Sequence, residues 1–285
     1  MPHPRRALCF AASALAALVG LSACGLTADW SGIQGGTRDS GLPVDLDTGI
    51  PTVPDANAPS DAPALPEAQA TLGFCASLPT PVTFCSDFDE GGPVSAGWDT
   101  VDVYNMADTV TLSGTHFSSP SSFSSSLFDL VDPPLSARLV KELTTSATQV
   151  HIDFQMLLSA APTTGTLELA ALHENVGGVT YGVFLEEVNG VLQVSVRLEN
   201  QYNAPGPWTL GPPPASTAWT EFVIDINVAD SGSIVVREGG QMVVNATSVR
   251  TSTDDRNAMF VELGLYDNGS TAAQVNFDNV VLDWH

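Results

Sequence analysis

Short runs in which apolar and polar residues alternate fill the chain from Thr71 to His285. The clearest runs are 150–158, 192–198 and 222–228, where nearly every second residue is apolar. A period of two places the apolar side chains on one side of a β-strand, which is typical of a strand with one buried face. About a dozen such runs occur, and none has the 3.6-residue period of an amphipathic helix. The pattern therefore predicts an all-β domain.

Turn-forming residues lie between these runs. Asn189-Gly190 and Gly239-Gly240 each separate two alternating segments, and both dipeptides are typical of tight β-hairpins. Asp230–Gly232 and Asp267–Gly269 indicate two further reversals. Many antiparallel strands must cover their apolar faces with one another, so we expect two sheets packed about 10 Å apart.

Three parts of the chain resemble concanavalin A-like jelly rolls. They are Phe84–Gly91 followed by Trp98, Trp219–Ile226 with Ser233–Gly240, and Val275–Trp284. The resemblance implies a two-sheet antiparallel jelly-roll sandwich over 71–285, with the first and last strands close together. The family includes lectins, laminin-G-like modules, glycoside hydrolases and polysaccharide lyases, so function has to come from the site residues.

The first 25 residues resemble the signal of a bacterial lipoprotein. Arg5 and Arg6 precede the apolar run Ala7–Val19, which is shorter than the roughly 20 residues that span a bilayer. Leu21-Ser-Ala-Cys24-Gly25 follows, and the resemblance implies removal of residues 1–23 and lipidation of Cys24. The small residues alone would also fit ordinary secretion, and paired arginines also occur in twin-arginine signals.

Residues 24–70 are predicted to form a disordered tether. Residues 25–70 contain six Pro, six Gly and six Asp but one aromatic residue, Trp30. Such a composition buries too little apolar surface to offset the entropy of ordering. We therefore expect the domain to be displayed on the bacterial cell envelope by a lipid in the membrane, at the outer membrane or cell surface rather than the inner membrane.

The number of cysteines fits an exported protein with one disulfide. After loss of Cys9 and lipidation of Cys24, Cys75 and Cys85 remain. A pair in an exported protein predicts a disulfide, and closing so short a loop stabilises the fold by roughly 2.5–3 kcal/mol.

The net charge of −23 excludes a nucleic-acid partner held by phosphate contacts.

Two enzyme patterns of the family were compared with the chain. Glycosidases of this fold carry Glu-x-Asp-x-x-Glu on one strand, and none of the eleven Glu residues has Asp two positions later. Glu186-Glu187, beside a hairpin turn, is interpreted as solvated surface.

Polysaccharide lyases of this fold carry Gln-x-His on one strand, with Arg, Tyr and Lys on other strands. Gln149-Val-His151 matches the first part of this pattern, whereas Tyr-x-Lys-x-Gly is missing from the chain.

Two binding features complete the candidate sites. Calcium prefers oxygen ligands, and the family often holds one on its convex side, so a structural calcium near the paired chain ends is a hypothesis. Its candidate ligands are Asp87, Asp89, Glu90, Asp278 and Asn279. The loop Tyr202–Trp208 could offer Tyr202, Asn203 and Trp208 to a glycan, with packing as the alternative role of Trp208. Trp98, Trp219 and Trp284 are expected in the core.

The main hypothesis is a membrane-anchored, non-catalytic module that contacts a glycan or a surface protein, with no catalytic residue assigned. The alternatives are a carbohydrate-active enzyme, either polysaccharide lyase or glycoside hydrolase, with a divergent site, and a purely structural envelope lipoprotein.

Overall fold

The computed structural model describes seven stretches of the chain. They are 73–128, 135–144, 146–176, 179–198, 206–252, 258–267 and 272–285. The predicted signal peptide 1–23, Cys24 and the predicted tether 24–70 lie outside these stretches. Within them, no helix is long and apolar enough to cross a membrane.

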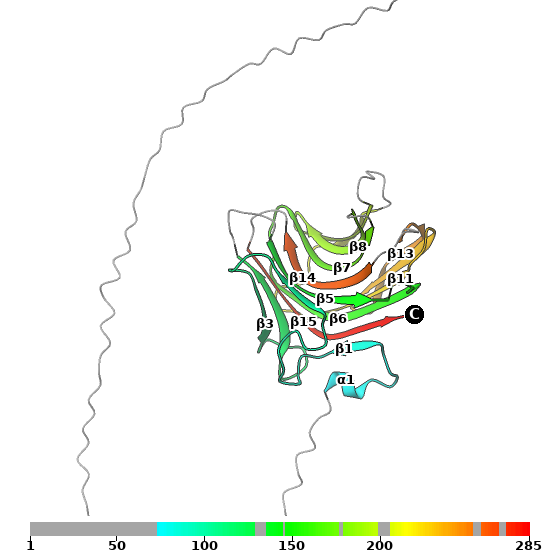
Figure 1. Cartoon of the computed structure of the whole chain (residues 1–285). Coiled ribbons are helices and arrows are strands. Elements are labelled where there is room, and N and C mark those ends of the chain that lie inside the picture. Colours follow the sequence, from blue (N-terminus) through cyan, green and yellow to red (C-terminus); the bar gives the residue numbers. More distant parts are fainter. Residues whose placement is uncertain are drawn as a thin grey trace, which may run out of the picture. The chain divides into compact units, whose positions relative to one another are not determined.

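Two antiparallel sheets form a sandwich (Figure 1), as predicted from the alternating runs and the turn residues. The eight-stranded sheet has the order β13 (Gln241–Val249), β12 (Gly232–Glu238), β11 (Thr220–Asn227), β6 (Gln149–Ala160), β15 (Ala273–Trp284), β4 (Ser122–Leu127) and β3 (Thr109–Ser113), with β1 (Phe84–Ser86) paired to β15. The seven-stranded sheet has the order β10 (Trp208–Gly211), β9 (Val191–Leu198), β8 (Val179–Val188), β7 (Thr166–Val176), β14 (Ala258–Asp267), β5 (Leu135–Leu143) and β2 (Thr100–Val103).

Details of the pairing confirm several expectations. The hairpin β8–β9 turns at Asn189-Gly190, and the hairpin β12–β13 turns at Gly239-Gly240. The first and last strands are neighbours, since Phe84 of β1 pairs with Leu282 of β15. The disulfide Cys75–Cys85 is present and ties the short helix α1 (Phe74–Ser77) to β1.

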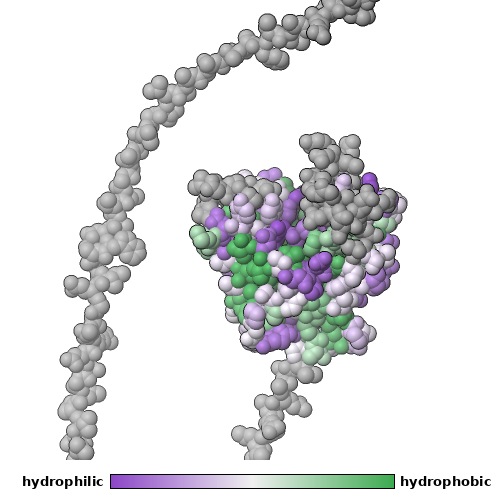
Figure 2. Space-filling view, viewed as in Figure 1, coloured by the Kyte–Doolittle hydropathy of each residue, from purple (hydrophilic) through white to green (hydrophobic). Residues whose placement is uncertain are grey.

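The core lies between the sheets and is rich in phenylalanine. Phe123, Phe154, Phe222 and Phe277 are fully buried, and Phe154 packs edge-on against Phe277 with ring centroids 5.4 Å apart. On the face seen in Figure 2, hydrophobic residues lie in patches separated by hydrophilic ones.

The three tryptophans that were expected in the core differ in position. Trp98 is buried in it, and Trp284 packs against it. Trp219 is only half-buried and meets Phe117 edge-on, with ring centroids 6.2 Å apart. The expectation was therefore wrong for Trp219, which precedes β11 in a loop.

Candidate active site

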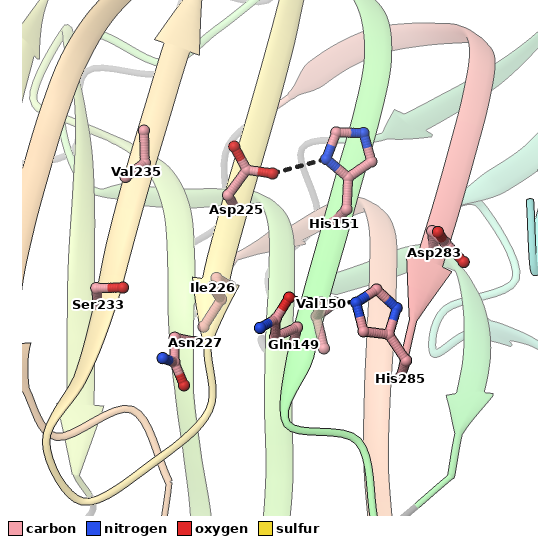
Figure 3. Close-up of a pocket in the computed structure, with 10 residues that line it drawn as sticks. All are labelled: Gln149, Val150, His151, Asp225, Ile226, Asn227, Ser233, Val235, Asp283 and His285. Carbon is pink, nitrogen blue, oxygen red and sulfur yellow. Dashed lines mark hydrogen bonds and ion pairs between the residues drawn. The ribbon is translucent and has the colours of Figure 1, made fainter.

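Gln149 and His151 line a pocket on the outer face of the eight-stranded sheet (Figure 3). The pocket has a volume of about 290 Å³ and lies where β6, β11, β12 and β15 run side by side. Gln149 and His151 point to the same side of β6, as the Gln-x-His spacing predicts.

The polar groups of this pocket are paired with one another and well solvated. His151 Nδ1 lies 2.7 Å from Asp225 Oδ1, and Arg237 binds the other oxygen of the same carboxylate at 2.7 Å. The His151 and Asp225 side chains are each about 40% exposed. Burial raises the pKa of Asp225, but the bonds from His151 and Arg237 outweigh it and lower the pKa overall. The pocket holds neither tyrosine nor arginine among its lining residues.

A second polar group of residues lies on the outer face of the seven-stranded sheet. We define the charged face as eight side chains that point away from the core: Asp102, Arg138, Glu168, His173, Glu186, Arg197, Glu262 and Tyr266. Strand alternation places them there, because residues such as Leu139 beside Arg138 and Leu263 beside Glu262 are fully buried in the core. The strands that carry it, among them β7, β8 and β14, are strongly bent (Figure 1).

A β-bulge aligns two members of the charged face. Along β7, Ala171 and His173 face outward, so simple alternation would turn Leu169 outward as well. The register shifts between Glu168 and Ala170, and Leu169 is instead buried in the core. Glu168 thereby points outward, directly opposite Tyr266 of β14 and Glu186 of β8.

Gly264 lets β14 approach β5 closely beside this bulge. Its φ is +132°, and a Cβ there would lie 2.3 Å from the carbonyl oxygen of Ala137. The close approach sets Gly264 opposite Arg138, whose guanidinium lies over the Tyr266 ring at 4.7 Å from its centroid.

Arg138 is the centre of one half of the charged face. Its Nη2 binds Asp102 at 2.6 Å, and its Nη1 binds Glu262. The other carboxylate oxygen of Glu262 lies 3.2 Å from His173 Nε2. Only 16% of the Arg138 side chain and 8% of the Glu262 side chain are exposed, so this network is mostly withdrawn from water.

Arg197 is the centre of the other half. Its guanidinium binds Glu168 and Glu186 and lies over the Phe184 ring, 4.6 Å from the centroid. Gln193 donates from Nε2 to Glu186 at 2.8 Å. Each arginine is thus held between two carboxylates.

Burial changes the proton affinity of this face. Burial raises the pKa of Tyr266, and the nearby charge of Glu168 raises it further, so the phenol keeps its proton at neutral pH. Burial also raises the pKa of Glu168, against the opposing charge of Arg197. For Asp102, burial works in the same direction, but hydrogen bonds from Ser136 and Arg138 outweigh it and lower the pKa.

Of the residue types that were expected around Gln149 and His151, the charged face holds arginine and tyrosine, but its eight members include no lysine. Arg138, His173 and Tyr266 come from the adjacent strands β5, β7 and β14. Phe260-Val-Glu262-Leu-Gly264 occupies the spacing of Tyr-x-Lys-x-Gly, with Phe in place of Tyr and Glu in place of Lys. The Phe260 ring packs edge-on against His173 with centroids 5.3 Å apart.

The interpretation of Glu186-Glu187 as solvated surface was wrong. Glu186 is 3% exposed and belongs to the charged face, whereas Glu187 is fully buried and accepts a hydrogen bond from Gly190 N. Both carboxylates accept hydrogen bonds from nearby donors, and these bonds offset the cost of burying them at this strand end.

The proposed sugar-binding loop is described only in part. Tyr202 and Asn203 lie outside the described residues. Trp208 is half-buried and packs against the core, and Gly206 lies against its indole ring.

Four of the candidate calcium ligands accept hydrogen bonds from the protein itself. Asp278 Oδ2 accepts hydrogen bonds from Phe117 N and Ser118 N, both at 2.8 Å, and Asn279 accepts one from Ser118 Oγ. Asp89 accepts from Ser121 N, and Asp87 accepts from Cys75 N. In the described stretches, no three His, Cys, Asp or Glu residues are grouped to hold a metal. The calcium site stays a prediction. The hydrogen bonds of Asp278 and Asp89 hold the loop 117–121, and that of Asp87 holds α1.

Fold and pairing define the protein as an antiparallel two-sheet jelly-roll sandwich. Its sequence matches no protein-family model and no curated protein. Among solved structures it is similar to an endo-β-1,4-glucuronan lyase from the fungus Trichoderma reesei, with 17% identity and a TM-score of 0.57 over 71% of this chain and 95% of that one. At this identity the similarity shows a shared fold.

Two further structures share the fold at comparable coverage. The alginate lyase Aly36B is 10% identical, with a TM-score of 0.52 over 71% of this chain and 97% of that one. A carbohydrate esterase of a Shiga toxin-encoding bacteriophage is 12% identical, with a TM-score of 0.50 over the same shares.

Proposed function

We propose that the protein is a carbohydrate-active enzyme that cleaves a uronate-containing polysaccharide by β-elimination on the charged face. The observation that carries this proposal is a series of contacts on neighbouring strands: Glu262 joins His173 to Arg138, and the Arg138 guanidinium lies over the Tyr266 ring. The fold shared with a glucuronan lyase and an alginate lyase supports it. This is the enzymatic alternative of the sequence analysis, with its site on the other sheet.

β-Elimination needs three protein groups. One must stabilise the negative charge that develops on the uronate carboxyl group, one must remove the proton from the adjacent α carbon, and one must protonate the leaving glycosidic oxygen. The bond between the β carbon and that oxygen then breaks as a carbon–carbon double bond forms. The elimination consumes no water and requires no cofactor.

The charged face offers one residue for each task. Arg138 is the cation for the substrate carboxylate. His173, oriented by the bond between its Nε2 and Glu262, is the base, and the protonated phenol of Tyr266 is the acid. Arg138 lies over the ring of Tyr266 and also binds Glu262, the carboxylate that orients His173.

The test is to incubate the full chain with polyglucuronate, alginate and hyaluronan and to follow the absorbance of the unsaturated product. We expect cleavage of at least one polymer, lost in His173→Ala and in Tyr266→Phe. His151→Ala is the matched control, because His151 also pairs with a carboxylate but lies on the other sheet. Activity that disappears in His151→Ala and survives in His173→Ala would contradict the assignment.

A binding module without catalysis is the second candidate. The observation in its favour is that both arginines already have carboxylate partners. A glycan array run with the full chain separates the two: retained binding with no product from any bound polymer supports the module.

We also propose that the domain is carried on the bacterial cell envelope by lipid on Cys24, which lies outside the described residues. The sequence Leu21–Gly25 supports this location. Two or more acyl chains give stable membrane anchoring. Cys24→Ser is expected to move the protein from the membrane to the soluble fraction; membrane retention of that variant would contradict lipidation.

A further inference from the structure

The proposed base and the proposed acid lie at different points along β14. His173 of β7 pairs with Phe260, whereas Tyr266 lies six residues further along β14 itself. At about 3.3 Å per residue, this spacing separates the Cα atoms of His173 and Tyr266 by roughly 20 Å. Glu262 and Arg138 lie between them on the outer face of the sheet. The imidazole and the phenol therefore approach one place on the sheet from two sides.

The reacting atoms of the two side chains are also apart. His173 Nε2 faces Glu262 Oε1 at 3.2 Å, so the nitrogen left to act as base is Nδ1, for which the described residues offer no hydrogen-bond partner. An imidazole Nδ1 lies roughly 3 Å, and a phenol oxygen roughly 6–7 Å, from its own Cα atom. With the bend of β14 allowed for, about 8 Å or more remains between the base nitrogen and the Tyr266 oxygen. Glu262 and Arg138 supply the contacts between the two side chains.

The stereochemistry of a uronate decides where a base and an acid have to stand. In glucuronate and mannuronate, the α proton and the oxygen on the β carbon lie on the same face of the sugar ring. One residue, or two residues in contact, must then reach both. In galacturonate and guluronate, the proton and the oxygen lie on opposite faces. A base and an acid that each approach within hydrogen-bond reach then stand on two sides of the ring, roughly 8 Å apart.

We infer that the charged face carries out an anti elimination, and that its substrate contains uronates of the galacturonate and guluronate class, whose α proton and β oxygen lie on opposite ring faces. This inference rests on the proposed function. The sugar ring lies over Arg138 and Glu262, between the imidazole and the phenol.

The proton and electron transfers follow from this placement. His173 Nδ1 takes the α proton from one face of the ring, and the electrons of that carbon–hydrogen bond form the double bond. The bond to the leaving oxygen breaks on the other face, where Tyr266 gives its proton to that oxygen. Solvent then carries the proton from the imidazole back to the phenol for the next turnover.

The first experiment measures kcat/KM of the full chain on two pairs of polymers that differ at one ring carbon. Polyguluronate and polymannuronate differ at the α carbon, and polygalacturonate and polyglucuronate differ at the β carbon. We expect the guluronate or the galacturonate polymer to be cleaved faster than its partner by about 100-fold, the scale of a lost general acid or base.

Two results of this comparison are contrary, and they differ in meaning. Faster cleavage of polymannuronate, polyglucuronate or the glucuronate-containing hyaluronan would overturn the inference and leave the β-elimination intact. Absence of cleavage on every one of these polymers contradicts the proposed function itself, and the inference falls with it.

The second experiment separates the base from the acid by exchange of the α proton in heavy water. Tyr266→Phe keeps the base, so we expect deuterium to enter the uncleaved polymer while cleavage falls by about 100-fold. His173→Ala should lose both exchange and cleavage. His151→Ala, on the other sheet, is the control and should keep both. Melting temperatures verify that the variants are folded. Exchange that disappears in a folded Tyr266→Phe would show that the phenol also removes the proton, which overturns the inference.

Discussion

His173 Nε2 lies 3.2 Å from Glu262 Oε1, and the second oxygen of the same carboxylate binds Arg138. One buried side chain thus fixes both the imidazole that we assign as base and the guanidinium that we assign to the substrate carboxylate. Glu262 is therefore a positioning residue, and on β14 it lies directly opposite Ala171 of β7.

Glu262→Gln is expected to lower kcat on the cleaved polymer by about 100-fold, the scale of a misplaced general base. The KM should change little, because the amide oxygen still accepts from Arg138. The measurement is a kcat and KM comparison with melting temperatures of both proteins. A change in KM alone would show that Glu262 binds substrate rather than positions His173.

Arg138→Ala is expected to destabilise the protein by about 3 kcal/mol, because it leaves Glu262, whose side chain is only 8% exposed, without its cation. Urea unfolding measures the change. Arg237→Ala is the control: its partner Asp225 is 41% exposed, and exposed ion pairs contribute about 1 kcal/mol or less. Equal losses in the two variants would show that the Arg138 network carries no special stability.

Gly264→Ala is expected to destabilise by more than about 1 kcal/mol, since an added Cβ meets the Ala137 carbonyl oxygen and the φ of +132° is unfavourable for alanine. It should also reduce activity, because Gly264 pairs with Arg138. Gly114→Ala is the control, as no atom lies within 4 Å of its added Cβ. Thermal unfolding and the cleavage assay distinguish the variants; similar melting temperatures would show that the close approach of β14 to β5 is not required.

Local sequence patterns were sufficient for most of the fold. Runs such as 150–158 alternate because one face of β6 is buried, and Asn189-Gly190 supplies the backbone conformation of a tight hairpin. Both signals come from neighbouring residues, so they can be read without knowing which strands pair.

The charged face could not be found in the same way. Its members come from six strands, and a search for Glu-x-Asp-x-x-Glu along one strand does not detect carboxylates that meet across strands. The bulge at Leu169 also breaks the alternation of β7, which hides the outward position of Glu168. One signal was present: Glu262 interrupts the otherwise apolar centre of β14, where a charged side chain needs a partner.

Asp153 gives a prediction about pH that is independent of catalysis. It lies on β6 opposite Val223 and Val281, on the outer face of the eight-stranded sheet. Burial, with the charges of Glu221 and Asp225, raises its pKa from 3.8 to about 6, against the opposing effect of His151. The folded protein therefore holds this proton more tightly than the unfolded chain. The stabilising contribution is complete below pH 3.8 and is lost as the pH rises through about 6.

Asp153→Asn removes the charge that the folded state disfavours above pH 6. We expect its melting temperature to exceed that of the unchanged protein by about 2–4 °C at pH 7.5, corresponding to roughly 1 kcal/mol after allowance for screening by solvent. At pH 4 the two should melt at nearly the same temperature, since Asp153 is then protonated in the fold. Asp230→Asn, at an exposed turn, is the control and should show no such dependence on pH. A melting temperature that is lower in Asp153→Asn at pH 7.5 would mean that attraction between Asp153 and His151 outweighs burial and the neighbouring carboxylates.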